Sequence, residues 1–211
     1  MIFRLDKRVI FPEARLAEPD GLLAVGGDLS TGRLMLAYQN GIFPWYNEHG
    51  PILWYSPHER FVLYPSELRI TKSMRVVLNS NKFHITVNQC FEKVMAACSS
   101  VERRNQHGTW ITAAMKTAYE QLHRKGYAHS VEVWEQNNLV GGLYGVQIGS
   151  VFCGESMFSL VSNASKTALI HVCSSGLYRL IDCQVHTDHL ESMGARLISR
   201  DEYMDVLRCE I

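Results

Sequence analysis

The segment AHSVEVWEQNNLVGGLYGVQIGSVFCGESMF, residues 128–158, constrains the fold more strongly than any other part of the chain. It contains three runs rich in Val, Tyr, Phe and Trp, separated by Gln136-Asn137-Asn138 and by Ile148-Gly149, and both separators suit tight turns. Turns this short join consecutive strands in antiparallel order. The segment therefore predicts a three-stranded antiparallel meander, to which the rest of the chain must be added.

Helices and further strands are predicted on both sides of the meander. Apolar spacing indicates helices at 71–79, 89–99, 112–125, 163–174, 187–193 and 201–208, and strands at 61–64, 83–87, 180–186 and 195–199. Five of the six prolines lie before residue 60, where the only regular element expected is a helix over 30–40.

This order of elements predicts an α+β fold with mixed α/β layers. We expect a small N-terminal lobe over residues 1–60. Residues 61–211 would form a domain with a central, mostly antiparallel sheet covered by helices. The order resembles that of acetyltransferase-like (GNAT-like) folds, which by itself implies no particular function.

Composition narrows the class of protein. With 46% hydrophobic and 20% charged residues the chain can build an ordinary core. No run approaches the ~18 apolar residues of a membrane span, and charges interrupt the N-terminus where a secretory signal would be apolar. These features predict a cytoplasmic protein with no membrane partner.

The charge of the chain is unevenly distributed. Net charge is zero, yet residues 60–125 hold eleven Lys or Arg and four acidic residues. The basic residues of this region either attract a polyanion or are scattered over solvated surfaces.

The strand LIDCQVH places Asp182 and Gln184 on one face by alternation. One interpretation is a sheet face open to water. The other is the polar floor of a cleft, where the carboxylate accepts a proton or binds a cation and the amide both donates and accepts hydrogen bonds. A metal site is less favoured, because no second cluster completes the nearby candidate ligands Cys183, His186, Asp188 and His189.

Glu155 and two tryptophans are further candidates. Glu155 lies among apolar residues in VFCGESMF, so it is either a residue with a perturbed pKa in a site or an exposed edge residue, and a bulge at Gly154 would change its register. Trp45 and Trp110 lie in predicted loops beside proline or glycine. They either pack in the core or stack on a nucleobase, an interaction of about 1–3 kcal/mol per base.

Taken together, several segments resemble one family over about residues 17–200. The matching segments, in order, are EPDGLLAVGGDLS, LMLAYQNGIFPWY, PILWYSP, GTWIT, AHSVEVWEQNNLVGGLYGVQIGSVFCGESMFS, NASKTAL and LIDCQV. The chain resembles the bacterial leucyl/phenylalanyl-tRNA–protein transferases. The resemblance implies transfer of Leu or Phe, sometimes Met, from aminoacyl-tRNA to the α-amine of proteins with N-terminal Arg or Lys, which marks them for N-degron degradation.

The resemblance also implies roles for individual residues. Asp182 and Gln184 would lie at the reacting centre with Glu155 close by, and Trp45 and Trp110 would bracket the terminal adenosine of the tRNA. The pocket for the Leu or Phe side chain would be lined by Leu143, Phe152, Met157, Ser165 and Ala168. The tRNA phosphates would be contacted by Arg69, Lys72, Arg75 and Lys82, a sparser basic set than is usual in the family. Because the aminoacyl ester is already activated, we expect no cofactor and no metal, and we expect a monomer.

Two other functions remain open at this point. One is an acetyl-CoA-dependent N-acetyltransferase on the same fold, although the Arg/Gln-x-x-Gly-x-Gly/Ala loop that binds coenzyme A is not found in the sequence. The other is a non-catalytic tRNA-binding protein, which would need the basic residues and the tryptophans but not the pair Asp182 and Gln184.

Overall fold

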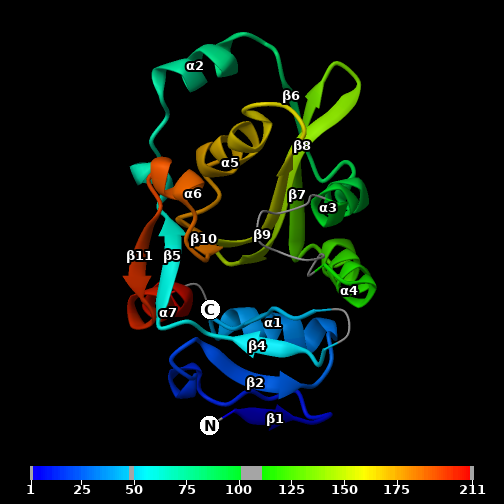
Figure 1. The fold of residues 1–211 in the computed structure, drawn as a ribbon, viewed down its shortest axis with the longest axis vertical. Coiled ribbons are helices and arrows are strands. Elements are labelled where there is room, and N and C mark those ends of the chain that lie inside the picture. Colours follow the sequence, from blue (N-terminus) through cyan, green and yellow to red (C-terminus); the bar gives the residue numbers. More distant parts are fainter. Residues whose placement is uncertain (1, 48–49, 101–110, 210–211) are drawn as a thin grey trace.

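Two β-sheets organise the molecule (Figure 1). The computed structural model describes residues 2–47, 50–100 and 111–209. Within these residues the smaller sheet has the strand order β1-β2-β4-β3, and the larger one has the order β11-β5-β10-β9-β8-β7-β6.

The smaller sheet forms from residues that were expected to be irregular. Its strands are β1 (Phe3–Leu5), β2 (Leu22–Gly26), β3 (Phe43–Pro44) and β4 (Leu53–Tyr55). The β1–β2 pair is parallel and the other pairs are antiparallel. This sheet was not predicted because strands of two to five residues, interrupted by glycines and prolines, carry too little alternation to be recognised.

The predicted helix in this region is confirmed as α1 (Thr31–Gln39). Ser30 caps it, because its hydroxyl accepts a hydrogen bond of 3.4 Å from the backbone N–H of Arg33. Leu34, Ala37 and Tyr38 are buried on one face, as their spacing predicts. The short 3₁₀ helices η1 (Ala14–Leu16) and η2 (Pro65–Glu67) complete the connections.

The larger sheet contains the predicted meander and is mostly antiparallel, which confirms the expected fold class. Among the described residues, the β9–β10 pair is the one parallel pair of this sheet, and its other neighbouring strands pair in antiparallel order. The strands are β5 (Glu59–Leu63), β6 (His84–Val87), β7 (Ala128–Glu135), β8 (Asn138–Ile148), β9 (Val151–Ser159), β10 (Leu180–Gln184) and β11 (Arg196–Ser199).

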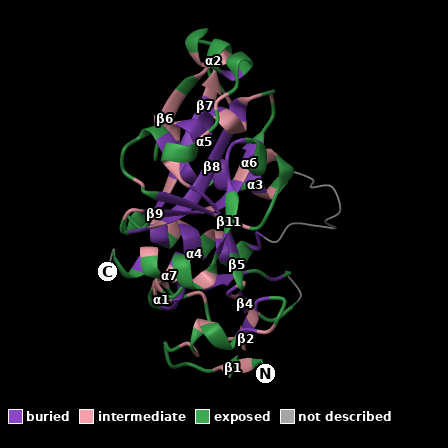
Figure 2. Cartoon of the chain, turned by 90° about the vertical axis from the view of Figure 1, so that its left-hand side faces the viewer, coloured by how far each residue is buried: buried purple, intermediate pink, exposed green. Residues whose placement is uncertain are grey.

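Helices cover both faces of this sheet. In Figure 1, α5 packs on one face of β7–β9, and α3 and α4 pack on the other. Figure 2 shows the central strands buried, whereas α2 is largely exposed. The helices are α2 (Lys72–Asn79), α3 (Phe91–Ser100), α4 (Ala113–Arg124), α5 (Ala164–Ser174), α6 (Asp188–Ser192) and α7 (Arg200–Arg208).

One hydrophobic cluster links the smaller sheet to the larger one. It joins Leu34 of α1 and Trp54 of β4 to Tyr119 of α4 and to Val146 of β8. The division of the chain near residue 60 stays a prediction. Among the described residues, no helix is both long enough and apolar enough to cross a bilayer.

Glycines in β8 allow its backbone to pack closely against neighbouring residues. A Cβ atom added to Gly145 would overlap the carbonyl oxygen of Cys153 and lie 2.6 Å from Cζ of Phe152. We expect Gly145→Ala to lower the free energy of unfolding by about 1–3 kcal/mol through overpacking, measured by urea denaturation.

The matched control is Gly32→Ala, in the first turn of α1, where an added Cβ meets nothing within 4 Å. Alanine has the higher helix propensity, so this variant should be as stable as the parent or slightly more stable. Equal stability of Gly145→Ala and the parent would show that β8 can move away from β9.

Candidate active site

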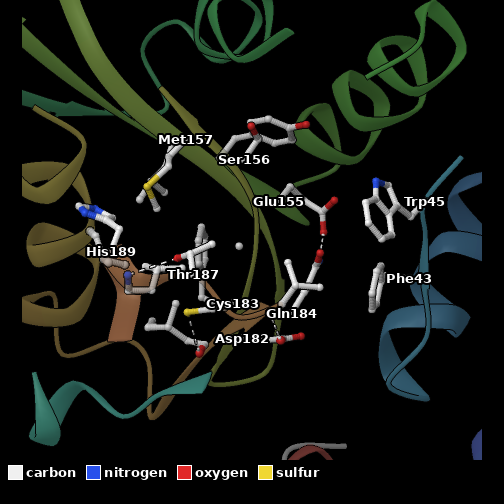
Figure 3. Close-up of a pocket in the computed structure, with 18 of the residues that line it drawn as sticks. Phe43, Trp45, Glu155, Ser156, Met157, Asp182, Cys183, Gln184, Thr187 and His189 are labelled. Carbon is white, nitrogen blue, oxygen red and sulfur yellow. Dashed lines mark hydrogen bonds between the residues drawn. The ribbon is translucent and has the colours of Figure 1, made fainter. Parts of the chain in front are cut away.

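A cavity of about 410 Å³ opens where β9 and β10 run side by side. Its walls come from β8, β9 and β10, from helices α5 and α6, and from β3 of the smaller sheet. Figure 3 shows Glu155, Gln184, Trp45 and Phe43 toward one end and Met157 and His189 toward the other. The cavity therefore carries Glu155 and Gln184 at one end, and the wall beyond them is mostly apolar but includes Thr187 and His189.

A bulge on β9 turns Glu155 into this cavity. Tyr144 of β8 pairs with Ser156, and the next residue, Gly145, pairs with Gly154, so Glu155 is the extra residue between them. Phe152 and Met157 consequently both line the cavity, although simple alternation would put them on opposite faces. The sequence suggested that a bulge at Gly154 would change the register of Glu155, and the observed bulge lies directly after Gly154.

The carboxylate of Glu155 is buried and accepts three hydrogen bonds. The hydroxyl of Tyr38 donates to Oε1 at 2.7 Å, the hydroxyl of Tyr119 donates to Oε2 at 3.0 Å, and Nε2 of Gln184 donates to Oε1 at 2.8 Å. Burial raises the pKa of Glu155 to about 7, although the three donors act in the opposite direction. Glu155 can thus change protonation state near neutral pH.

Tyr38 and Tyr119 contact the Glu155 carboxylate, an arrangement that the sequence did not reveal. Both lie at the apolar spacing of their helices, α1 and α4, and both are buried. Their hydroxyls contact each other as well as Glu155, and burial together with that carboxylate raises the pKa of each phenol well above its ordinary value. A tyrosine in an apolar stripe is itself a signal, because its buried hydroxyl requires a partner.

Asp182 lies beside Gln184, and its carboxylate is fully engaged by protein donors. Nε and Nη2 of Arg60 donate to its two oxygens at 2.9 and 2.8 Å, and the hydroxyl of Tyr203 donates to Oδ2 at 2.9 Å. The backbone N–H of Gln184 donates to Oδ1 at 2.9 Å. Asp182 itself is fully buried.

Arg60, which by sequence was counted only among the basic residues of 60–125, is 2% exposed. Its guanidinium lies 4.7 Å from the ring centroids of both Phe43 and Tyr203, and Nη1 donates to the carbonyl of Gly41 at 3.1 Å. Burial disfavours its charge, but the Asp182 carboxylate outweighs this, so the pKa of Arg60 is raised above its ordinary value.

Three of the five residues predicted for the amino-acid pocket line the cavity together. They are Leu143, Phe152 and Met157. Ser165 and Ala168 of α5 do not line it; Ala168 is buried in the core, and the residue of α5 that reaches the cavity is Leu169.

The predicted nucleotide-binding residues are placed in part. Trp45 lines the cavity at the end nearest Glu155, is 39% exposed, and packs edge-on against Tyr55 (Figure 3). Trp110 lies outside the described residues. The four predicted phosphate-binding residues are exposed on and around α2, and none lines the cavity: Arg69, Lys72, Arg75 and Lys82.

The candidate metal ligands divide between two places. Cys183 and His189 line the cavity. His186 and Asp188 are exposed outside it with Glu191, and one ligand atom from each lies within 4.8 Å of the others. A hydrogen bond of 2.9 Å from His186 to Glu191 accounts for part of this proximity. Exposed acidic groups often gather without an ion, and the expected absence of a metal stays a prediction.

An apolar cavity that ends at a carboxylate titrating near neutrality, beside an amide, suits an enzyme that transfers an acyl group to an amine. Two family models match most of the chain and identify which family of acyl-transferring enzymes it belongs to. The model described as leucyl/phenylalanyl-tRNA protein transferase matches residues 62–208, and the model of its N-terminal domain matches residues 27–58. The chain belongs to the leucyl/phenylalanyl-tRNA protein transferase family.

Curated relatives agree over nearly the whole length. A leucyl/phenylalanyl-tRNA–protein transferase of Syntrophobacter fumaroxidans is 56% identical over 209 residues, which cover 98% of this chain and 89% of the relative. One of Flavobacterium johnsoniae is 51% identical over 210 residues, which cover 98% and 99%. These findings confirm the predicted transferase function over the acetyl-CoA and non-catalytic alternatives.

Among solved structures, a GCN5-related N-acetyltransferase from Kribbella flavida superposes with a TM-score of 0.37 and 11% identity. The superposition covers 82% of this chain and 62% of that one.

Proposed function

We propose that this transferase moves Leu or Phe, and sometimes Met, from aminoacyl-tRNA to the α-amine of proteins that begin with Arg or Lys. The product would enter N-degron degradation, and the enzyme would act as a cytoplasmic monomer. The observation that carries the proposal is the cavity in which an apolar wall ends at Gln184 and Glu155.

The apolar wall would hold the side chain of the aminoacyl group. Leu143, Phe152 and Met157 offer no charge to it, so burial of an apolar side chain is favoured by about 25 cal/mol per Å². The flexible thioether of Met157 can adapt to a branched or an aromatic side chain. Ser165 and Ala168, which lie within about one helical turn of Leu169 in α5, would shape this wall from behind.

Gln184 and Glu155 would form the reacting centre. Since Nε2 of Gln184 donates to Glu155, its carbonyl oxygen is oriented to accept a hydrogen bond from the incoming α-amine. The neutral amine nitrogen attacks the ester carbonyl and its proton passes to Glu155. Glu155 then gives this proton to the tRNA ribose oxygen as the ester C–O bond breaks, which regenerates the carboxylate. A Glu155 pKa of about 7 lies close to the ~7.7–8.0 of an α-amine, which suits this proton transfer.

Asp182 would act by orienting Gln184. Three roles are open to a carboxylate at this position: orienting Gln184, accepting the amine proton, and binding the acceptor's cation. Its four hydrogen bonds to Arg60, Tyr203 and Gln184 favour the first, because they occupy the oxygens that the other two roles require.

The tRNA would approach from the Trp45 side. We propose that Trp45 and Trp110 stack on either face of the terminal adenosine, which the exposure of Trp45 beside Glu155 supports. Contacts to tRNA phosphates would come from the exposed side chains around α2, namely Arg69, Lys72, Arg75 and Lys82.

A transfer assay tests the proposed acceptor specificity. Phe-tRNA carrying labelled Phe is incubated with a peptide that begins with Arg and with the same peptide beginning with Gly. Label should pass to the first peptide and not to the second. Labelling of both would refute the Arg/Lys requirement, and labelling of neither would refute the proposed reaction.

A further inference from the structure

We propose that Arg60 and Tyr203 are positioning residues for aminoacyl transfer, which act through Asp182 on Gln184. The inference rests on the proposed role of Gln184 at the reacting centre. It adds two residues from β5 and α7 that do not line the cavity.

The backbone of Gln184 adopts a conformation that requires external support. Its φ angle is +63°, in the left-handed region that a residue with a Cβ rarely occupies. The register between β10 and β5 shifts here as well, since Asp182 pairs with Val62 and Gln184 with Phe61. The hydrogen bond from the Gln184 backbone N–H to Oδ1 of Asp182 holds this turn and so directs the amide toward Glu155.

Arg60 and Tyr203 determine where the Asp182 carboxylate lies. Arg60 holds both carboxylate oxygens in a two-pronged ion pair, a geometry that fixes the plane of the carboxylate as well as its distance. Tyr203 donates to Oδ2 from the C-terminal helix α7. A shift of either side chain would move Asp182, and with it the turn at Gln184.

The same guanidinium also fixes the nucleotide end of the cavity. It lies against the ring of Phe43, which lines the cavity beside Trp45, and it donates to the carbonyl of Gly41. Arg60 thus connects β3, which Trp45 follows directly in the chain, to the strand that carries Gln184. Because Arg60 and Tyr203 are 2% and 1% exposed and lie outside the cavity lining, their effect on the reaction must be indirect.

Tyr203→Phe is the sharpest test, since it removes one oxygen atom and keeps the ring that packs on Arg60. A hydrogen bond to a charged group is strong enough to change a rate by about 10- to 100-fold. We expect kcat for transfer of Phe to the Arg-started peptide to fall by about that factor, while KM for Phe-tRNA changes by less than about 2-fold. Both are measured well below the unfolding temperature of each protein.

Tyr64→Phe is the matched control. The Tyr64 hydroxyl donates to Glu202 of α7 at 3.4 Å, whereas the hydroxyl of Tyr203, which itself lies on α7, donates to Asp182. This variant should keep the parental kcat. Arg60→Lys, which keeps the charge and loses the two-pronged geometry, should lose more activity than Tyr203→Phe.

The results distinguish failure of the positioning role from failure of the proposed function. If the parent transfers Phe and Tyr203→Phe keeps its kcat, or loses activity only through KM, the positioning role is overturned. The same holds if Tyr64→Phe loses as much kcat as Tyr203→Phe. If the parent itself transfers nothing to the Arg-started peptide, the proposed function fails instead.

Discussion

Asp182→Ala is expected to abolish aminoacyl transfer and to lower the free energy of unfolding by about 3–5 kcal/mol, while tRNA binding persists. The stability loss follows because Arg60 would remain buried without its counter-ion. Transfer is lost because the turn at Gln184 loses the carboxylate that holds it. Filter binding of tRNA, a single-turnover transfer assay and urea denaturation measure the three quantities.

A double variant separates stability from catalysis. Replacing the pair by apolar residues, as in Asp182→Leu with Arg60→Met, removes the unpaired charge, and such exchanges are often neutral or stabilising. The double variant should therefore recover most of the lost stability without recovering transfer. Recovery of transfer along with stability would show that Asp182 serves only the fold.

Glu155→Gln is expected to remove the pH dependence of transfer that arises from this residue and to lower kcat by about 10²–10⁴-fold. Glu155 can accept the amine proton only when ionised, so kcat of the parent should rise as pH increases through about 7 and then level off. The variant has an amide in place of the carboxylate, so its lower kcat should not follow that rise. The comparison uses one saturating Arg-started peptide, whose own α-amine titrates equally in both assays.

The same residue predicts how stability changes with pH. The folded-state pKa of about 7 lies above the ordinary value of 4.5, so the folded protein binds more protons than the unfolded chain between these values. Its contribution to stability is therefore complete below pH 4.5 and is lost as pH rises through 7, a change of about 3 kcal/mol. Glu155→Gln should lack this decline. A parent whose stability is constant between about pH 5 and 8, after subtraction of the variant's curve, would contradict the raised pKa.

Local patterns were enough to predict the larger sheet and its helices. The meander follows from strand-rich runs and turn residues that lie next to each other in the chain, and β7 begins and ends where it was expected. Helices α1, α2, α4 and α5 start within a residue or two of their predicted positions, because their apolar spacing is also local. Side-chain caps begin α1, α2 and α4, whereas Asn163 makes no such hydrogen bond at the start of α5. The smaller sheet was missed because its strands are short and pair through partners distant in sequence.

The candidate site was predictable only where polar residues interrupt an apolar strand. Glu155, Asp182 and Gln184 stood out for that reason, and the structure brings all three to one end of the cavity. The side chains that hold these three residues gave no such signal. The tyrosines Tyr38, Tyr119 and Tyr203 are ordinary members of apolar helix faces, and Arg60 lies near the start of a strand.

Residues close together in the chain were thus sufficient to predict the meander, the α+β class, the family and the polar residues of the proposed reacting centre. How fully each carboxylate is occupied became known only from the folded molecule, in which Asp182 accepts four hydrogen bonds and Glu155 accepts three. Asp182 meets Arg60 from 122 residues away, and Glu155 meets Tyr38 from 117 residues away. Burial and hydrogen bonding set the protonation and orientation of a carboxylate, and both are properties of the packed environment that no local pattern contains.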